Sequence, residues 1–371
     1  MAYKRYLESQ IIQDLQKKMV FVGGARQVGK TTLARKILGD QQGYLNWDIA
    51  EHRERILKKE LPPVETLAFD EIHKYRSWRN YIKGLYDSDP KDRRIMVTGS
   101  ARLDYYRHGG DSLQGRYHYL RLFPLSCAEL TITSSRDLQE LLLLGGFPEP
   151  FFASSKIESR RWSREYRKRL IEEDLQSLER VQDLGNLELL MLRLPELVGS
   201  PLSINALRED LQVSHKTVAN WICILERLYA IFRLSPFGAP KIRAVKKEQK
   251  HYHYDWTLIK EPGPRFENMV ALHLLKWVCF QEDTLGLDME LRYFRDVDGR
   301  EVDFVIMEDR KPIFFIECKT SDEASGKGLK YLKARFPDCN ALQISATGSK
   351  DVLTNDNIRM MPAVDFLAGL V

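Results

Sequence analysis

The alternation of apolar and polar positions along the first third of the chain predicts an α/β fold. Short apolar runs at residues 19–22, 66–69 and 94–98 are typical of buried strands in a parallel sheet, which is covered on both faces. A glycine-rich segment follows the first run, and a helical pattern at residues 33–38 follows that segment. We therefore expect a strand–loop–helix unit at the start of a parallel sheet.

The middle of the chain changes to helical periodicity. Residues 201–211 read as a short helix, residues 212–213 as a tight turn, and residues 215–229 as a longer helix capped by Ser214. Two short strand patterns, at residues 232–234 and 251–254, flank a basic loop. This order predicts a helix-turn-helix followed by a β-wing, which together form a winged helix.

The last third begins with an apolar helix at residues 265–280, followed by strand patterns at residues 293–295, 301–306 and 312–319. A Gly- and Pro-rich stretch at residues 144–150 interrupts the chain much earlier. A length of 371 residues also favours two or three domains over one. We therefore expect three domains, covering residues 1–150, 151–255 and 256–371.

Composition narrows the class of protein. No apolar run approaches the roughly 18 residues that a membrane helix requires, and the N-terminus is too polar for a secretory signal. The five cysteines are scattered singly, without the spacing of a metal site or a disulfide framework. The net charge of +5 is too small to identify a nucleic-acid-binding protein by itself. These features predict a reduced, cytoplasmic protein with no membrane association.

The glycine-rich segment carries the first chemical motif. Gly24, Gly29, Lys30 and Thr31 fit the pattern GxxxxGK(S/T), which lies here between a predicted strand and a predicted helix. Backbone N–H groups of such a loop wrap phosphates, the lysine reaches the β- and γ-phosphates, and the hydroxyl binds Mg²⁺. We expect ATP with Mg²⁺ to bind at Gly24, Arg26, Gln27, Val28, Gly29, Lys30, Thr31 and Thr32.

Further residues fit the chemistry of ATP hydrolysis. The apolar run at 66–69 ends in Asp70 and Glu71, which we expect to hold Mg²⁺ and to polarise the attacking water, respectively. Ser100, at the end of the next strand, is a candidate for orienting the water or sensing the γ-phosphate. Arg116, with Arg121 in reserve, is a candidate for neutralising charge in a neighbouring subunit's site, although a surface arginine paired to a carboxylate explains it equally well.

The predicted winged helix offers a second kind of contact. The start of its longer helix would face the major groove of DNA, and its basic loop would contact phosphates. The candidate residues are His215, Lys216, Thr217, Asn220, Lys241, Arg243, Lys246 and Lys247. A winged helix used only for packing or protein contact remains an open alternative.

The C-terminal strands bring together a third set. Residues i and i+2 of a strand point to the same side, so Glu317 and Lys319 share a face, and Asp303 on the adjacent strand can meet Glu317. Glu267, on the preceding helix, is a further candidate ligand. Carboxylates that hold Mg²⁺ or Mn²⁺ beside a lysine suit phosphodiester hydrolysis, whereas the plain alternative is a salt-bridged sheet surface.

Taken together, these motifs resemble a known group, the AAA+-type ATPases of bacteria and archaea that carry a nuclease-like C-terminal domain. The resemblance lies in the P-loop, the strand ending in Asp70 and Glu71, and the segments at residues 98–100, 115–126, 145–149, 266–268, 301–304 and 316–319. It implies an AAA+ P-loop core, a helical segment with a winged helix, and a domain similar to restriction-endonuclease PD-(D/E)xK nucleases. It also implies a homo-oligomer such as a ring.

The sequence therefore predicts an ATP-hydrolysing, DNA-binding protein with a candidate Mg²⁺- or Mn²⁺-dependent DNA endonuclease domain. The alternative is a regulatory ATPase that is switched by ATP and whose nuclease-like domain is inactive.

Overall fold

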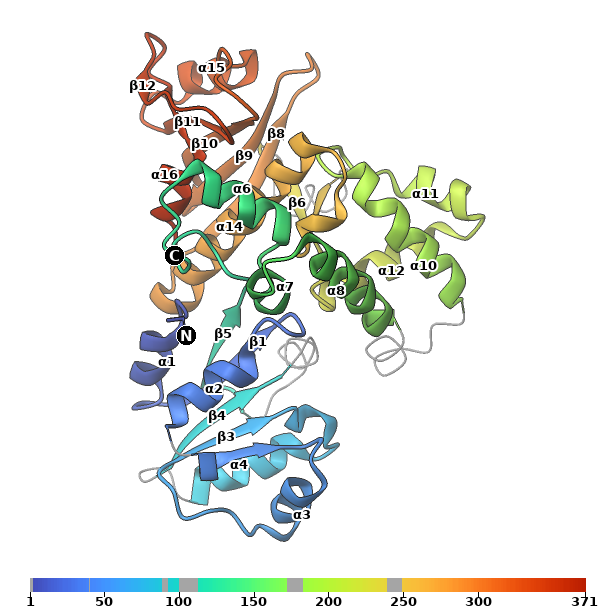
Figure 1. Ribbon diagram of the computed structural model, residues 1–371, viewed down its shortest axis with the longest axis vertical. Coiled ribbons are helices and arrows are strands. Elements are labelled where there is room, and N and C mark those ends of the chain that lie inside the picture. The colour runs from blue at the N-terminus through green and yellow to red at the C-terminus, as the bar shows by residue number, and fades with distance from the viewer. Residues whose placement is uncertain (1–2, 40, 89–92, 100–112, 172–182, 239–248) are drawn as a thin grey trace. The chain divides into compact units, whose positions relative to one another are not determined.

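The computed structural model describes residues 3–39, 41–88, 93–99, 113–171, 183–238 and 249–371. The chain divides into two compact units, Met1–Pro124 and Leu125–Val371. Each is built around its own sheet (Figure 1).

The first unit contains a five-stranded sheet in the order β2-β3-β4-β1-β5, and every neighbouring pair is parallel. Its strands are β1 (Met19–Gly24), β2 (Tyr44–Asn46), β3 (Thr66–Asp70), β4 (Arg94–Thr98) and β5 (Tyr117–Leu122). Its helices are α1 (Glu8–Asp14), α2 (Lys30–Leu38), α3 (Ala50–Lys58) and α4 (Trp78–Ser88). This sheet confirms the predicted parallel α/β core.

Burial explains why these strands read as continuous apolar runs. All six residues of β1 are buried, and Phe21, Phe69 and Val97 from three strands share one cluster with Trp78 of α4. Because the strands are parallel, their C-terminal ends lie at one edge of the sheet. That edge therefore carries the residues that follow β1, β3 and β4.

The second unit begins with helices and continues into a large sheet. Its helices are α6 (Ser135–Leu144), α7 (Pro148–Phe152), α8 (Lys156–Arg169), α10 (Leu184–Arg193), α11 (Ile204–Leu211), α12 (His215–Arg227), α14 (Pro262–Phe280), α15 (Lys327–Arg335) and α16 (Ala363–Ala368). Ser214 caps α12 by accepting a hydrogen bond from the Thr217 N–H, as its position before the helical pattern predicted. No helix in the described ranges is long and apolar enough to span a bilayer.

The second sheet has eight strands in the order β12-β13-β11-β10-β9-β8-β6-β7. They are β6 (Ile231–Pro236), β7 (Lys250–His253), β8 (Met289–Arg295), β9 (Glu301–Glu308), β10 (Lys311–Lys319), β11 (Asn340–Ser345), β12 (Val352–Leu353) and β13 (Arg359–Pro362). The antiparallel pair β6–β7 joins this sheet because Ser235 and Pro236 pair with Arg292 and Tyr293 of β8. The sequence pattern contained no signal for this junction.

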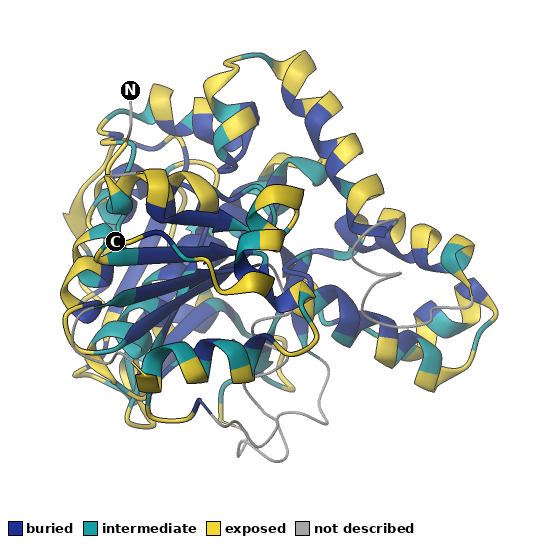
Figure 2. Cartoon of the chain, turned by 90° about the horizontal axis from the view of Figure 1, so that it is seen from below, coloured by how far each residue is buried: buried dark blue, intermediate teal, exposed yellow. Residues whose placement is uncertain are grey.

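Helices cover both faces of the strands that matter most for the site. Strand β9 runs antiparallel to β10, and α15 packs with Val302, Val305 and Phe315 of these strands in one apolar cluster. Helix α14 contacts β8, β9 and β10. Strands of the sheet are largely buried, whereas the helices alternate buried and exposed positions (Figure 2).

A buried ion pair fixes α14 to the loop that opens the second unit. The ammonium of Lys276 contacts the carboxylate of Glu129, and the two side chains are only 2% and 3% exposed. Lys276 Nζ also donates to Ser126 Oγ (2.8 Å), and that hydroxyl donates to the Val371 carbonyl (2.8 Å). Removal of one partner from such a pair leaves an uncompensated buried charge.

We expect Lys276→Met to lower the free energy of unfolding by about 3–5 kcal/mol, because Glu129 is then buried without its counter-ion. Urea denaturation of the full chain measures this loss. The double variant Glu129→Gln/Lys276→Met should recover most of it, since neither charge then remains. An equal loss in both variants would show that packing, not charge, explains the effect.

Candidate functional site

The P-loop lies at the C-terminal end of β1, where glycine is required. Gly24 and Gly29 adopt φ angles of 151° and 100°, and a Cβ atom on Gly24 would lie 2.3 Å from the Leu122 carbonyl oxygen. Helix α2 begins at Lys30, whose Nζ donates to the carbonyls of Gly24 (3.0 Å) and Ala25 (2.6 Å). The other predicted ATP-binding residues lie in the same loop or the first turn of α2: Arg26, Gln27, Val28, Thr31 and Thr32.

The carboxylate of Asp70 collects hydrogen bonds from three different elements. Its Oδ2 accepts from Thr31 Oγ1 (2.7 Å) and Tyr44 Oη (2.5 Å), and its Oδ1 accepts from Thr98 Oγ1 (2.6 Å). Burial, and then the Asp70 carboxylate, raise the pKa of Tyr44 to about 12, so that its hydroxyl stays a donor. The Asp70 side chain is thereby buried and held in one orientation beside the P-loop.

The residues at this position fit a magnesium ion. A hydroxyl and a carboxylate, from Thr31 and Asp70, already lie within 2.7 Å of each other, and both are oxygen ligands of the kind that Mg²⁺ prefers. Bound with the nucleotide, Mg²⁺ would neutralise charge on the phosphates.

Glu71 follows Asp70 in a backbone conformation that is unusual for this residue type, with a φ of 57°. Burial raises the pKa of its carboxyl, and its Oε2 lies 3.5 Å from Lys74 Nζ and 3.6 Å from His73 Nε2. A left-handed conformation for a non-glycine residue costs energy and is found preferentially at functional positions. The Glu71 carboxylate lies within electrostatic range of both Lys30 and Asp70.

One residue of this region was missed by the sequence analysis. Arg5 is buried, and its guanidinium donates to the carbonyls of Val28 in the P-loop (2.7 Å) and Phe123 after β5 (2.5 Å). It therefore clamps the loop to the end of the neighbouring strand. A single arginine in a polar N-terminal segment carries no signal that could have revealed this contact.

Arg116 lies at the N-terminal ends of β1 and β5, opposite the strand ends that carry the P-loop. Its carbonyl accepts from the N–H of Met19, the first residue of β1, and its guanidinium is paired with Asp87 (2.8 Å). Because β1 is six residues long, about 20 Å separates this end of β1 from Gly24. Arg116 therefore cannot reach its own chain's phosphates. Ser100 lies outside the described residues.

The C-terminal candidates meet in a cavity of about 380 Å³. It is lined by Gly263, Pro264, Phe266, Glu267, Glu301, Asp303, Glu317, Cys318, Lys319 and Thr320. Lys319 Nζ lies 3.0 Å from Glu317 Oε1, and Asp303 Oδ2 accepts from the Cys318 N–H (2.8 Å). The structure thus brings together the helix glutamate, the strand aspartate and the Glu-x-Lys pair.

A buried lysine organises one side of this cavity. Lys250, fully buried at the start of β7, contacts Glu301 Oε1 (2.5 Å) and Glu267 Oε1 (3.4 Å), and Tyr252 Oη donates to the same Glu267 oxygen (2.7 Å). Burial opposes the charge of Lys250, but Glu267, Asp303 and Glu301 raise its pKa overall. Glu267 therefore has protein partners of its own. The sequence analysis did not identify Lys250 as part of this group.

The other side of the cavity keeps two carboxyl groups. Burial, and then the negative charge of Glu267, raise the pKa of Asp303 to about 8. Glu317 Oε2 is buried and has no hydrogen-bond partner. A cation in the cavity would lower the pKa of Asp303 and would give Glu317 Oε2 a partner. Among the described residues, however, no three His, Cys, Asp or Glu side chains form a metal-binding group.

The residues predicted to face DNA begin helix α12. His215, Lys216 and Asn220 are exposed, and Thr217 is partly buried, with its Oγ1 2.8 Å from Ser214 Oγ. The basic-loop candidates Lys241, Arg243, Lys246 and Lys247 lie outside the described residues.

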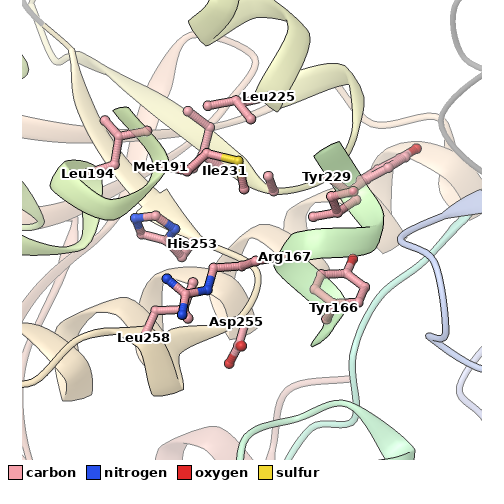
Figure 3. Close-up of a pocket in the computed structure, with 12 residues that line it drawn as sticks. Tyr166, Arg167, Met191, Leu194, Leu225, Tyr229, Ile231, His253, Asp255 and Leu258 are labelled. Carbon is pink, nitrogen blue, oxygen red and sulfur yellow. The ribbon is translucent and has the colours of Figure 1, made fainter. Parts of the chain in front are cut away.

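A further cavity lies between α8, α10, α12 and β7 (Figure 3). Arg167, His253 and Asp255 provide its polar side chains, and its volume is about 20 Å³. Burial, and then the neighbouring His251, lower the pKa of His253 well below its ordinary value. A space of this size holds a water molecule and no larger ligand.

Family comparisons divide the chain into three consecutive matches. Residues 16–131 match an AAA domain, residues 135–261 a domain of unknown function (DUF8612), and residues 262–366 another domain of unknown function (DUF4143). Among curated proteins, none matches the chain. With the P-loop and the parallel sheet, the first match identifies the N-terminal part as an AAA-type P-loop ATPase domain.

Several solved structures show distant similarity. RuvB of Thermotoga maritima is 16% identical, with a TM-score of 0.29 over 61% of this chain and 87% of RuvB. The Aeropyrum pernix ORC1 protein, solved in complex with DNA, is 12% identical, with a TM-score of 0.34 over 72% of this chain and 93% of its own. Bacteroides Pif1, bound to single-stranded DNA, is 15% identical, with a TM-score of 0.22 over 38% and 49%. Scores this low assign no role to any residue here.

We expect Lys30→Ala to abolish ATP binding, because Lys30 contacts phosphate in the ground state. Glu71→Gln should still bind ATP but hydrolyse it at least about 10²-fold more slowly, because Glu71 acts only on the attacking water. Nucleotide binding by fluorescence and phosphate release measure the two effects. Glu65→Gln, an exposed carboxylate beside the opposite end of β3, is the matched control and should turn over normally. Normal turnover by folded Glu71→Gln would exclude Glu71 as the base.

Proposed function

We propose that this chain is an ATP-hydrolysing DNA-binding protein whose C-terminal region is a metal-dependent DNA endonuclease. The observation that carries the proposal is the cavity in which Asp303, Glu317 and Lys319 meet. The AAA-type domain supplies the energy source, and the cavity supplies a second kind of chemistry in a separate sheet.

In the ATPase domain, we propose roles for the P-loop residues and for the pair Asp70 and Glu71. The backbone of the P-loop and the ammonium of Lys30 hold the phosphates, and Thr31 with Asp70 would hold Mg²⁺. Glu71 would orient the attacking water and accept its proton. Tyr44 and Thr98 keep the Asp70 carboxylate in one orientation through their hydrogen bonds.

The DNA-binding half of the proposal is supported by α11, α12, β6 and β7, whose order matches a winged helix. A three-residue turn separates α11 from α12, and β6 and β7 are antiparallel. His215, Lys216 and Asn220 lie exposed in the first turns of α12, where a recognition helix contacts base edges. We expect these residues to face the major groove.

In the C-terminal cavity, Asp303 and Glu317 would hold the divalent ion, Mg²⁺ or Mn²⁺. Such an ion would activate water for attack on a phosphodiester and stabilise the leaving oxygen. Lys319, held by Glu317, would place its positive charge where charge develops on the phosphate. Glu267 would act indirectly, because Lys250 and Tyr252 already contact Oε1 of its carboxylate.

One observation favours a second candidate, a regulatory ATPase whose C-terminal domain does not cut. Lys250 already neutralises Glu267 and Glu301 inside the cavity, which leaves fewer carboxylates for a metal ion. Incubation of the full chain with duplex, single-stranded, forked and four-way DNA, with ATP and Mg²⁺ or Mn²⁺, separates the two functions. A metal-dependent cut supports the endonuclease, and binding without cutting supports the regulator.

We expect Asp303→Asn and Glu317→Gln to abolish DNA cleavage while ATP hydrolysis stays normal, because these residues belong to a different sheet from Lys30 and Asp70. Lys319→Met should bind metal but cut about 10²-fold more slowly. Gel assays of the substrate panel and phosphate release measure the two activities.

Glu308→Gln is the matched control for these variants, since Glu308 ends the same strand β9 outside the cavity. It should cut DNA like the unmodified chain. Cleavage by Asp303→Asn at the normal rate would place the activity elsewhere.

We further propose that the chain acts as a homo-oligomer in which Arg116 completes a neighbour's ATP site. Arg116→Ala should lower turnover by about 10³-fold while ATP still binds. Mixtures of Arg116→Ala and Glu71→Gln chains should regain activity at interfaces that combine two intact residues. Asp87→Asn, which frees Arg116 from its ion pair without removing it, should remain active. If mixing restores nothing, Arg116 has no role in trans.

A further inference from the structure

Helix α8 concentrates the positive charge of the chain. Its 14 residues, KIESRRWSREYRKR, include seven arginines and lysines and two glutamates. The resulting charge of +5 equals the net charge of all 371 residues. The rest of the chain is therefore close to neutral as a whole.

The charges of α8 are sorted by side. At 3.6 residues per turn, Lys156, Arg160, Arg164 and Lys168 follow one another at i+4 spacing along one flank, about 6 Å apart. We call these four residues the basic flank. Both glutamates lie on the opposite flank, where Glu158 pairs with Arg161 (3.0 Å) and Glu165 with Arg169 (3.1 Å).

The residues of the basic flank are exposed cations. Lys156, Arg160 and Arg164 are exposed, and none of them has an acidic partner within the described part of the chain. Unpaired cations on a surface are stable when water solvates them, so their alignment adds nothing to folding. Folding therefore does not explain why the flank has only one sign of charge.

The helix that carries this flank is firmly anchored. Trp162 stacks on Tyr166 with ring centroids 4.8 Å apart, and its Nε1 donates to Glu149 (3.2 Å). Ser159 Oγ donates to the Leu144 carbonyl (3.0 Å). The basic side chains thus project from a fixed base, which reduces the entropy lost when they bind a partner.

The basic flank also lies near the start of α14, whose first residues line the carboxylate cavity. Helix α8 contacts the 3-10 helix Trp256–Leu258, which directly precedes α14. The pKa of Arg265 in α14 is lowered first by burial and, against the opposing charge of Asp255, by the positive charge of Arg160. Arg265 is in the first turn of α14, between Pro264 and Phe266, which line the cavity.

From this arrangement we infer that the basic flank of α8 binds the phosphate backbone of duplex DNA and guides it toward the cavity of Asp303 and Glu317. The inference rests on the proposed function, because it names the surface that holds the proposed DNA substrate. Guanidinium groups suit phosphate through paired hydrogen bonds, and the i+4 spacing presents them in a row along the strand. These contacts are independent of base sequence.

A membrane surface fits the same charges less well. Helices that bind bilayers insert an apolar face, whereas the apolar face of α8 is buried against the protein through Trp162 and Tyr166. Ile157 is exposed, but one isolated side chain does not make an apolar face. Nucleic acid is therefore the partner that the exposed chemistry favours.

Two double variants of the full chain test the inference. Arg160→Gln/Arg164→Gln removes two residues of the basic flank, and Arg161→Gln/Arg169→Gln removes two ion-paired arginines from the same helix with the same change in charge. Fluorescence anisotropy of a labelled 30-base-pair duplex, titrated over a range of KCl concentrations, gives the salt dependence of binding. Urea denaturation of the full chain, followed by circular dichroism, confirms that both variants are folded.

We expect the flank variant to lower the slope of log K against log [KCl] by about 2, because each lost phosphate contact removes about 0.9. The control variant should change the slope by less than half as much. An unchanged slope in the flank variant, or equal losses in both variants, overturns the inference while leaving the proposed DNA binding intact. Absence of duplex binding by the unmodified chain would instead overturn the proposed function and the inference together.

Vesicles of phosphatidylcholine with phosphatidylserine test whether the basic flank binds a membrane instead. Binding to these vesicles that is lost in the flank variant, with no change in DNA binding, would assign the surface to membranes and overturn the inference.

Discussion

Burying a charged group without partners costs free energy. In each candidate site of this chain, the arrangement of the side chains follows from the partners that the buried carboxylates require. Asp70 is held by three hydroxyl donors at the edge of the parallel sheet. In the second sheet, Lys250 and Lys319 compensate the carboxylates that surround the cavity. Helix α8 differs, because Lys156, Arg160 and Arg164 are exposed cations with no acidic partner among the described residues. Binding potential therefore remains where neutralisation is incomplete, at Glu317 Oε2 and on the basic flank.

Local patterns were enough to predict much of this arrangement. The P-loop was recognisable because its strand, glycines and helix are contiguous, and the parallel sheet confirmed the α/β core. The placement of Glu317 and Lys319 on one face follows from the two-residue period of a strand, which holds wherever β10 pairs. The position of Asp303 beside the end of β10, where its Oδ2 accepts from the Cys318 N–H, required only the antiparallel pairing of two strands that are close in sequence.

Contacts between distant segments could not be predicted in this way. Tyr44 reaches Asp70 from a separate strand, and Arg5 reaches Val28 and Phe123 from the N-terminal segment. Lys250 looked like part of a basic loop, yet it is fully buried among carboxylates. Each of these roles depends on which strands become neighbours, and hydrophobic periodicity gives no information about that choice. The pairing of β6 with β8 is the same kind of long-range event.

That pairing has a mechanical consequence. Strand β7 is hydrogen-bonded to β6, and the end of β6 pairs with β8. The first residue of β7 is Lys250, whose ammonium contacts both Glu267 and Glu301. A change in the position of the β6–β7 ribbon would therefore move Lys250 relative to Glu267 and Glu301. The charge balance of the cavity therefore depends on where the β6–β7 ribbon places Lys250.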